Sequence, residues 1–186
     1  MDIKDNKGIT LVVLVVTIIV LIIIAGVTIT AGTESIKKAK LETLRTNMLL
    51  IKAKGKEYCE EANFRAGIIN ENDTAEAKAE KIEKGKNYIK NPGEKVKGLL
   101  NEATAADLTS VNASLGDDAA NKYAVKLTTQ DLKDMGLNEV ANTQNEGEYI
   151  IIFDIKNNIV EVFNTQGYQD KNQTKYSLTE IEAIED

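Results

Sequence analysis

The sequence contains no histidine and no tryptophan, and its 186 residues include one cysteine and one proline. Without histidine, a Ser-His-Asp triad, a Cys-His dyad and a histidine-ligated zinc site are excluded. A single cysteine excludes an intramolecular disulfide and an all-cysteine metal site. The net charge of −6 disfavours a general nucleic-acid-binding protein, which normally presents a basic face. These absences point away from an enzyme, and the sequence predicts neither a cofactor nor a metal site.

The apolar residues are concentrated near the N-terminus. Charged side chains are absent between Gly8 and Thr33, and residues 9–29 are nearly continuous isoleucine, valine and leucine. About 20 apolar residues allow a helix to cross a bilayer, whereas a lone strand in lipid leaves its backbone polar groups unsatisfied. We therefore expect residues 9–33 to form a helix of roughly 38 Å, at about 1.5 Å per residue.

Three interpretations of this apolar run compete. A cleaved secretory signal has an apolar core of about 7–15 residues, which is shorter than this run, although residues 30–32 are small. A plain single-pass anchor fits the hydropathy fully. The third interpretation depends on residues 1–8, a short charged leader that ends in Lys7 and Gly8 directly before an apolar run opening Ile-Thr-Leu.

This arrangement resembles the processing site of type IV pilins and pseudopilins. In that family a prepilin peptidase cuts after the glycine on the cytoplasmic side and leaves the apolar helix attached. The resemblance implies cleavage between Gly8 and Ile9, after Lys7, with Ile9 as the N-methylated first residue. A glycine suits this position because it offers no Cβ to a protease that holds extended backbone closely.

The resemblance also implies how such a chain assembles. The apolar helix would bundle with those of other pilin-like subunits, driven by an assembly ATPase and a platform protein. Most family members carry glutamate at the fifth mature position, which is Val13 here, and this difference favours a minor or divergent subunit. The apolar run supplies these candidate assembly residues: Leu11, Val12, Val13, Leu14, Val16, Ile19 and Leu21.

The charges flanking the run bear on its orientation. The pilin resemblance implies a single-pass protein of the cell membrane with a cytoplasmic N-terminus and an extracytoplasmic head, displayed on a pilus or at the cell surface after assembly. Lys37, Lys38 and Lys40 follow the run closely, so the positive-inside rule alone favours the opposite orientation. Long domains cross membranes largely regardless of charge, and we therefore retain the pilin orientation.

After Glu34 the pattern becomes amphipathic, which predicts that the helix continues over residues 34–65 into the head. Steps of three and four residues define an apolar stripe: Leu41, Leu44, Met48, Ile51, Gly55, Tyr58 and Ala62. A coiled-coil stalk is the alternative, but only about three heptads fit and Gly55 lies on the seam. Cys59, beside this stripe, is expected to be a packed side chain because no histidine is present to activate it.

Residues 66–122 form a variable helical and loop region to which the sequence assigns no role. Within it we expect a surface helix over residues 74–90 capped by Thr74, a turn over residues 90–93, and one or two small helices over residues 94–115. Oxygen-bearing clusters occur at Asp117 and Asp118 and again near Asp154. Neither has the spacing of a known calcium loop, so both are interpreted as solvated turns.

Residues 123–186 hold six of the nine aromatic residues and predict a small antiparallel β head. Strands are expected over residues 123–127, 148–155 and 159–163, the last two forming a hairpin. Short helices are expected over residues 129–136, with an N-cap threonine and a C-terminal glycine, and over residues 177–184. The predicted fold class is α+β, a long N-terminal helix packed on a small antiparallel sheet, as in pilins.

Together these patterns predict a structural subunit of a type IV pilus, or of a secretion or DNA-uptake pseudopilus. Its expected partners are the membrane, a prepilin peptidase, other pilin-like subunits, and the assembly platform and ATPase, with no specific small molecule. The alternative is a single-pass membrane-anchored extracellular binding or sensor module that does not polymerise.

Overall fold

The computed structural model describes residues 6–92, 100–143 and 147–184, and within the first helix the side chains of residues 6–13, 15 and 21–32 lie outside this description. The chain divides into an N-terminal unit of residues 1–42 and a second unit of residues 43–186, which we call the head. Helix α1 (Asn6–Ala66) contributes residues to both units. The prediction of a helix over residues 9–33 that continues over residues 34–65 is therefore confirmed for the backbone.

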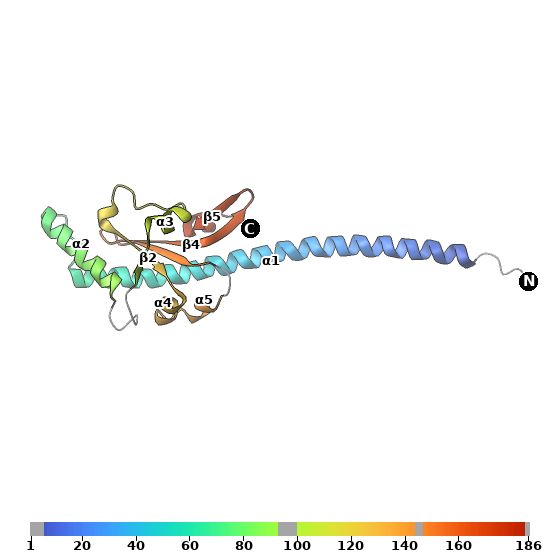
Figure 1. Cartoon of the computed structure of the whole chain (residues 1–186), viewed down its shortest axis with the longest axis horizontal. Helices are drawn as coiled ribbons and strands as arrows, with labels where there is room; N and C mark the ends of the chain where they lie inside the picture. The colour runs from blue at the N-terminus through green and yellow to red at the C-terminus, as the bar shows by residue number, and fades with distance from the viewer. Residues whose placement is uncertain (1–5, 93–99, 144–146, 185–186) are drawn as a thin grey trace, which may run out of the picture. The chain divides into compact units, whose positions relative to one another are not determined.

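The head contains an antiparallel sheet of five strands in the order β1-β2-β3-β4-β5. Figure 1 labels three of these strands, β2, β4 and β5. The strands are β1 (Asn101–Glu102), β2 (Lys122–Leu127), β3 (Tyr149–Asp154), β4 (Ile159–Asp170) and β5 (Gln173–Ser177). The α+β class with a long helix and an antiparallel sheet is thus confirmed, including the β3–β4 hairpin. Asn158 has a φ of 53° in the hairpin turn, a left-handed conformation that asparagine tolerates.

The short helices of the head largely match the expected segments. They are α2 (Ala75–Lys90), α3 (Ala105–Ser110), the 3-10 helix η2 (Ala119–Asn121), α4 (Thr129–Asp134), α5 (Asn138–Asn142) and α6 (Leu178–Glu182). Thr74 caps α2 as predicted, since its side chain accepts the Ala77 N–H at 3.2 Å. Gly136 follows α4 with a φ of 82°, as expected of a C-terminal glycine.

The predicted cap of α4 is wrong by one residue, and two other predictions fall partly on residues that the structure does not describe. The cap of α4 is Thr128 and Thr129 is the first helical residue, because the Thr128 hydroxyl accepts the Asp131 N–H at 3.1 Å. The expected turn over residues 90–93 and the expected helices over residues 94–115 fall partly on residues 93–99, which lie outside the described residues.

One face of the sheet packs against the part of α1 that belongs to the head. The predicted stripe residues of that part are all buried: Leu44, Met48, Ile51, Gly55, Tyr58 and Ala62. A Cβ built on Gly55 would lie 3.0 Å from Val160 and 3.6 Å from both Ile151 and Phe153. The stripe is therefore a helix-on-sheet contact, and for the head portion of α1 the coiled-coil alternative is wrong.

The other face of the sheet is covered by residues that the sequence analysis left without a role. Ala103, Leu108 and Val111 form one buried cluster with sheet residues on this face, namely Ala124, Ile150, Ile152 and Phe163. Because both faces are covered, all six residues of β3 are buried. Part of the region over residues 66–122 is thus a second core layer, in addition to supplying β1 at the sheet edge.

Candidate functional site

The predicted processing residues lie at the start of α1. Lys7, Gly8 and Ile9 belong to the first turns of this helix, which begins at Asn6. The side chains of these residues lie outside the described residues. The structure therefore places the expected cleavage point close to a helix terminus, where helices commonly fray.

The predicted assembly residues follow within the N-terminal unit. Leu14, Val16 and Ile19 are 60%, 53% and 50% exposed, and their neighbours Ile18 and Val20 are 47% and 45% exposed. Successive residues are about 100° apart around a helix, so these five aliphatic side chains spread over about two thirds of its circumference, and Thr17 lies in the remaining third. The remaining predicted assembly side chains, those of Leu11, Val12, Val13 and Leu21, lie outside the described residues.

A helix that is apolar on every side normally lies in a protein core or in lipid. The one polar side chain described within this stretch is locally satisfied, because the Thr17 hydroxyl donates to the Leu14 carbonyl oxygen at 3.2 Å. Within the described part of the chain, no helix combines the length and the hydropathy that crossing a membrane requires.

Two helical glycines of the head lie in tight contact with the β3–β4 hairpin. Gly55 in α1 lies against Val160, and a Cβ built on Gly85 in α2 would lie 2.9 Å from the Ile155 side chain. Ile155 itself is completely buried. Both glycines therefore let a helix approach the β3–β4 hairpin more closely than a larger residue allows.

Cys59 is buried on the same face of α1, as the sequence predicts. Its Sγ donates a weak hydrogen bond to the Asp154 carbonyl oxygen at 3.9 Å. Burial raises the pKa of the Cys59 thiol from 9.0 to about 11, against a smaller opposing effect of Lys56. The thiol is thus protonated at neutral pH, which leaves it a poor nucleophile.

The oxygen-bearing cluster near Asp154 is a turn in which the Asp154 carboxylate accepts hydrogen bonds from Asn157. The Asp154 carboxylate accepts the Asn157 backbone N–H at 3.0 Å and the Asn157 side-chain N–H at 2.8 Å. Among the described residues, no three histidine, cysteine or acidic side chains gather as a potential metal site. Asp117 and Asp118 are exposed residues beside η2.

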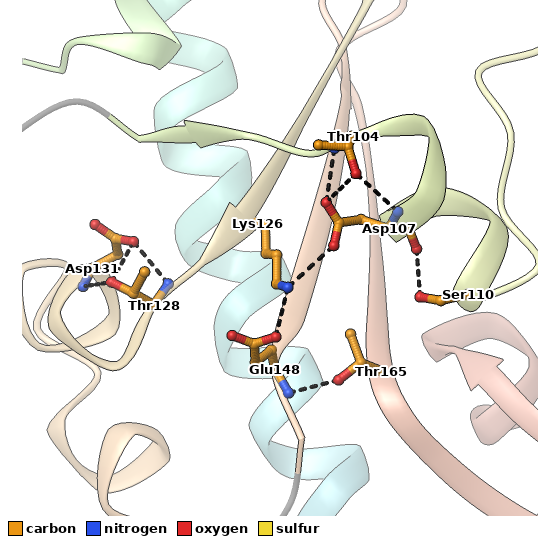
Figure 2. Close-up of polar contacts among 8 residues, drawn as sticks. All are labelled: Thr104, Asp107, Ser110, Lys126, Thr128, Asp131, Glu148 and Thr165. Atoms are coloured by element: carbon orange, nitrogen blue, oxygen red, sulfur yellow. Dashed lines mark hydrogen bonds and ion pairs between the residues drawn. The ribbon is translucent and has the colours of Figure 1, made fainter.

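A polar network that the sequence did not predict joins three elements of the head. The Lys126 Nζ on β2 lies 3.1 Å from the Asp107 carboxylate of α3 and 2.7 Å from that of Glu148, just before β3 (Figure 2). Contacts with Glu148 and Asp107 raise the pKa of Lys126. Asp107 also closes a capping box, because its carboxylate accepts the Thr104 N–H at 2.9 Å and the Thr104 hydroxyl at 2.6 Å.

This network links α3 to β2 above the buried apolar cluster. Hydrogen bonds from Thr104 and Lys126 lower the pKa of Asp107 from 3.8 to about 2. A depressed pKa means that the ionised carboxylate stabilises the folded head above about pH 4, and that this stabilisation is lost as the pH falls towards 2. The arrangement is therefore structural, since α3 carries the second core layer.

Replacing Asp107 by alanine is expected to destabilise the head by about 1–2 kcal/mol at pH 7, because Thr104 and Lys126 lose their charge-assisted hydrogen bonds to a partly exposed carboxylate. The difference in unfolding free energy between the two proteins is expected to shrink between pH 4 and pH 2, measured by urea unfolding. Asp117→Ala, at an exposed position, is the matched control and is expected to stay within about 0.5 kcal/mol. A difference for Asp107→Ala that is equal at pH 2.5 and pH 6 would contradict this assignment.

Comparison with known proteins returns no match of this chain to a family model, to a curated protein or to a solved structure.

Proposed function

We propose that this chain is a type IV pilin-like structural subunit, of minor or divergent type, that assembles through the apolar first part of α1. The observation that carries the proposal is the exposure of aliphatic side chains around most of the circumference of α1 at residues 14, 16, 18, 19 and 20. Such a surface is unfavourable in water at about 25 cal/mol per Å² of apolar area, so it needs a lipid or protein environment.

The leader and the head add support of different kinds. Lys7 and Gly8 stand directly before the apolar run, which is the sequence pattern of prepilin processing. In the head, α1 packs on an antiparallel sheet through Gly55 and its neighbours, the plan that the resemblance implies. Before assembly the apolar helix would reside in the membrane, and afterwards it would lie among the helices of other subunits.

The chemistry of the proposed function is association rather than catalysis. Processing would remove residues 1–8 and leave 178 of the 186 residues. The apolar helices would then pack side by side while the heads face outwards. A prepilin peptidase, the assembly platform and its ATPase are the partners that this function requires.

Crosslinking through single cysteines separates assembly from the alternative of a monomeric anchored module. Cysteines placed at Leu14, Val16 and Ile19 are expected to give dimers and higher ladders in intact cells treated with a membrane-permeable bismaleimide. Native Cys59 can remain, because it is buried and its pKa is about 11. Lys133→Cys, exposed on α4, is the control and is expected to give no ladder.

Monomers at all three helix positions would contradict assembly and favour the anchored binding or sensor module.

A further inference from the structure

The sheet of the head has an incomplete edge along the first residues of β4. Strand β5 pairs with β4 at Phe163 and again from Tyr168 to Asp170. After Ser177 the chain turns into α6, so β5 does not extend beside residues 159–162. Among the described residues, these four therefore have a neighbouring strand only on the β3 side.

The pairing of β4 with β3 shows which backbone groups face this edge. The Thr165 N–H donates to the Glu148 carbonyl oxygen at 2.8 Å, on the β3 side. Backbone groups of an antiparallel strand alternate between its two sides. Phe163, Glu161 and Ile159 consequently direct their N–H and C=O groups towards β3, while Val160 and Val162 direct theirs to the other side. Val162 lies next to the point where pairing with β5 begins, which leaves Val160 at the incomplete edge.

A groove runs beside this edge, and both lysines and apolar residues line it. It has a volume of about 420 Å³ and is bounded by residues 158–163 of the hairpin, by residues 177–179, and by Lys52 and Lys56 of α1. The two lysines lie one helical turn apart and have no ion-pair partner among the described residues. Ile159, at the start of β4, is 50% exposed.

The two faces of the sheet differ at this edge. Val160 packs towards α1, since it is the closest contact of Gly55, so Ile159, Glu161 and Phe163 lie on the opposite face. A strand added beside β4 would alternate in the same way. Its side chains on the α1 face would meet Lys52 and Lys56, and those on the other face would lie beside Ile159, Glu161 and Phe163.

We propose that the β4 edge is a docking site for an extended segment of a partner protein with alternating acidic and apolar side chains. The segment adds to the sheet by main-chain hydrogen bonds to Val160, in the manner of β-strand addition. Its acidic side chains pair with Lys52 and Lys56, and its apolar side chains cover Ile159. This site lies in the head and does not depend on processing at Gly8 or on assembly through the apolar helix.

The first test measures binding of the hexapeptide Val-Glu-Val-Glu-Val-Glu to the full chain in mild detergent. The double variant Lys52→Glu/Lys56→Glu is expected to weaken binding at least tenfold. Lys90→Glu/Lys133→Glu, which reverses two exposed lysines away from the groove, is the matched control and is expected to bind as the native chain does. Equal binding by both double variants, or no binding by the native chain, would overturn the proposal.

A second test distinguishes strand addition from simple charge attraction. Backbone amide exchange is expected to slow at Val160 when the peptide binds and to remain unchanged at Glu161, whose N–H already faces β3. Of two peptides N-methylated at alternate residues, in opposite phase, only one is expected to lose binding. Unchanged exchange at Val160, or equal binding of the two methylated peptides, would show that no strand is added.

Discussion

Replacing Gly55 by leucine is expected to lower the melting temperature of the head by roughly 4–8 °C. The added side chain enters space that Val160, Ile151 and Phe153 already occupy, with a first contact at 3.0 Å from the new Cβ. Overpacking of a core typically costs about 1–3 kcal/mol and sometimes more, whereas leaving glycine gains only about 1 kcal/mol of helix propensity. A loss of 1 kcal/mol lowers the melting temperature by about 2–4 °C in a domain of this size.

Two further variants separate the effect of the tight contact between residue 55 and the sheet from the effect of helix propensity. Ala53→Leu lies on the exposed side of the same helix and is expected to melt within about 2 °C of the native chain, because it meets no sheet residue. Gly55→Ala is expected to be nearly neutral, since its gain in propensity offsets the tight contact with Val160. Differential scanning calorimetry of the full chain checks all three, and an unchanged melting temperature for Gly55→Leu would show that α1 does not pack on the sheet as described.

Replacing Gly8 by alanine is expected to slow processing by prepilin peptidase at least tenfold. Two physical effects act in the same direction. Alanine adds a Cβ where the protease must hold the backbone closely, and it stabilises the helical conformation over glycine by about 1 kcal/mol. The second effect matters because Gly8 lies within the first turns of α1, which must unwind before an extended segment can enter a protease.

The control for this substitution is Asn6→Ala. It favours the same helical turn but leaves the residue at the expected cleavage point unchanged. Immunoblots of cells that co-express the peptidase separate the 186-residue precursor from the 178-residue product. We expect the Asn6→Ala precursor to be converted at close to the native rate and the Gly8→Ala precursor to accumulate.

Strong local patterns made much of the fold predictable from the sequence. The apolar stripe from Leu44 to Ala62 has a helical period, and residues 149–153 form a continuous apolar run bounded by turn residues, so helix and hairpin were both correctly placed. Thr74 and Gly136 carry conformational preferences of their own, which is why two helix termini were found. These features depend on neighbours within a few residues.

The second core layer had no comparable signal. Ala103, Leu108 and Val111 are separated by alanine, threonine, serine and aspartate, a composition typical of a surface segment. They are buried because they pack against Ala124, Ile150, Ile152 and Phe163, sheet residues that are distant from them in sequence. The short strand β5 is similarly polar, and only its hairpin with β4 places it in the sheet.

The fold of the head and the proposed function depend on different residues of α1. The residues of its head portion are explained by packing on the sheet, whereas the exposed aliphatic residues of the N-terminal unit are not. A variant of Gly55 is therefore expected to affect folding of the head, and a variant of Gly8 is expected to affect processing alone. This separation makes the central claim testable without disturbing the head.

The most direct measurement is the N-terminal sequence and mass of the chain after co-expression with a prepilin peptidase. Our account predicts a product that begins at Ile9, carries one additional methyl group on its N-terminal nitrogen, and is absent when Gly8 is replaced by alanine. A chain that retains Met1 through Gly8, with the native protein and Gly8→Ala indistinguishable, would contradict the assignment as a pilin-like subunit.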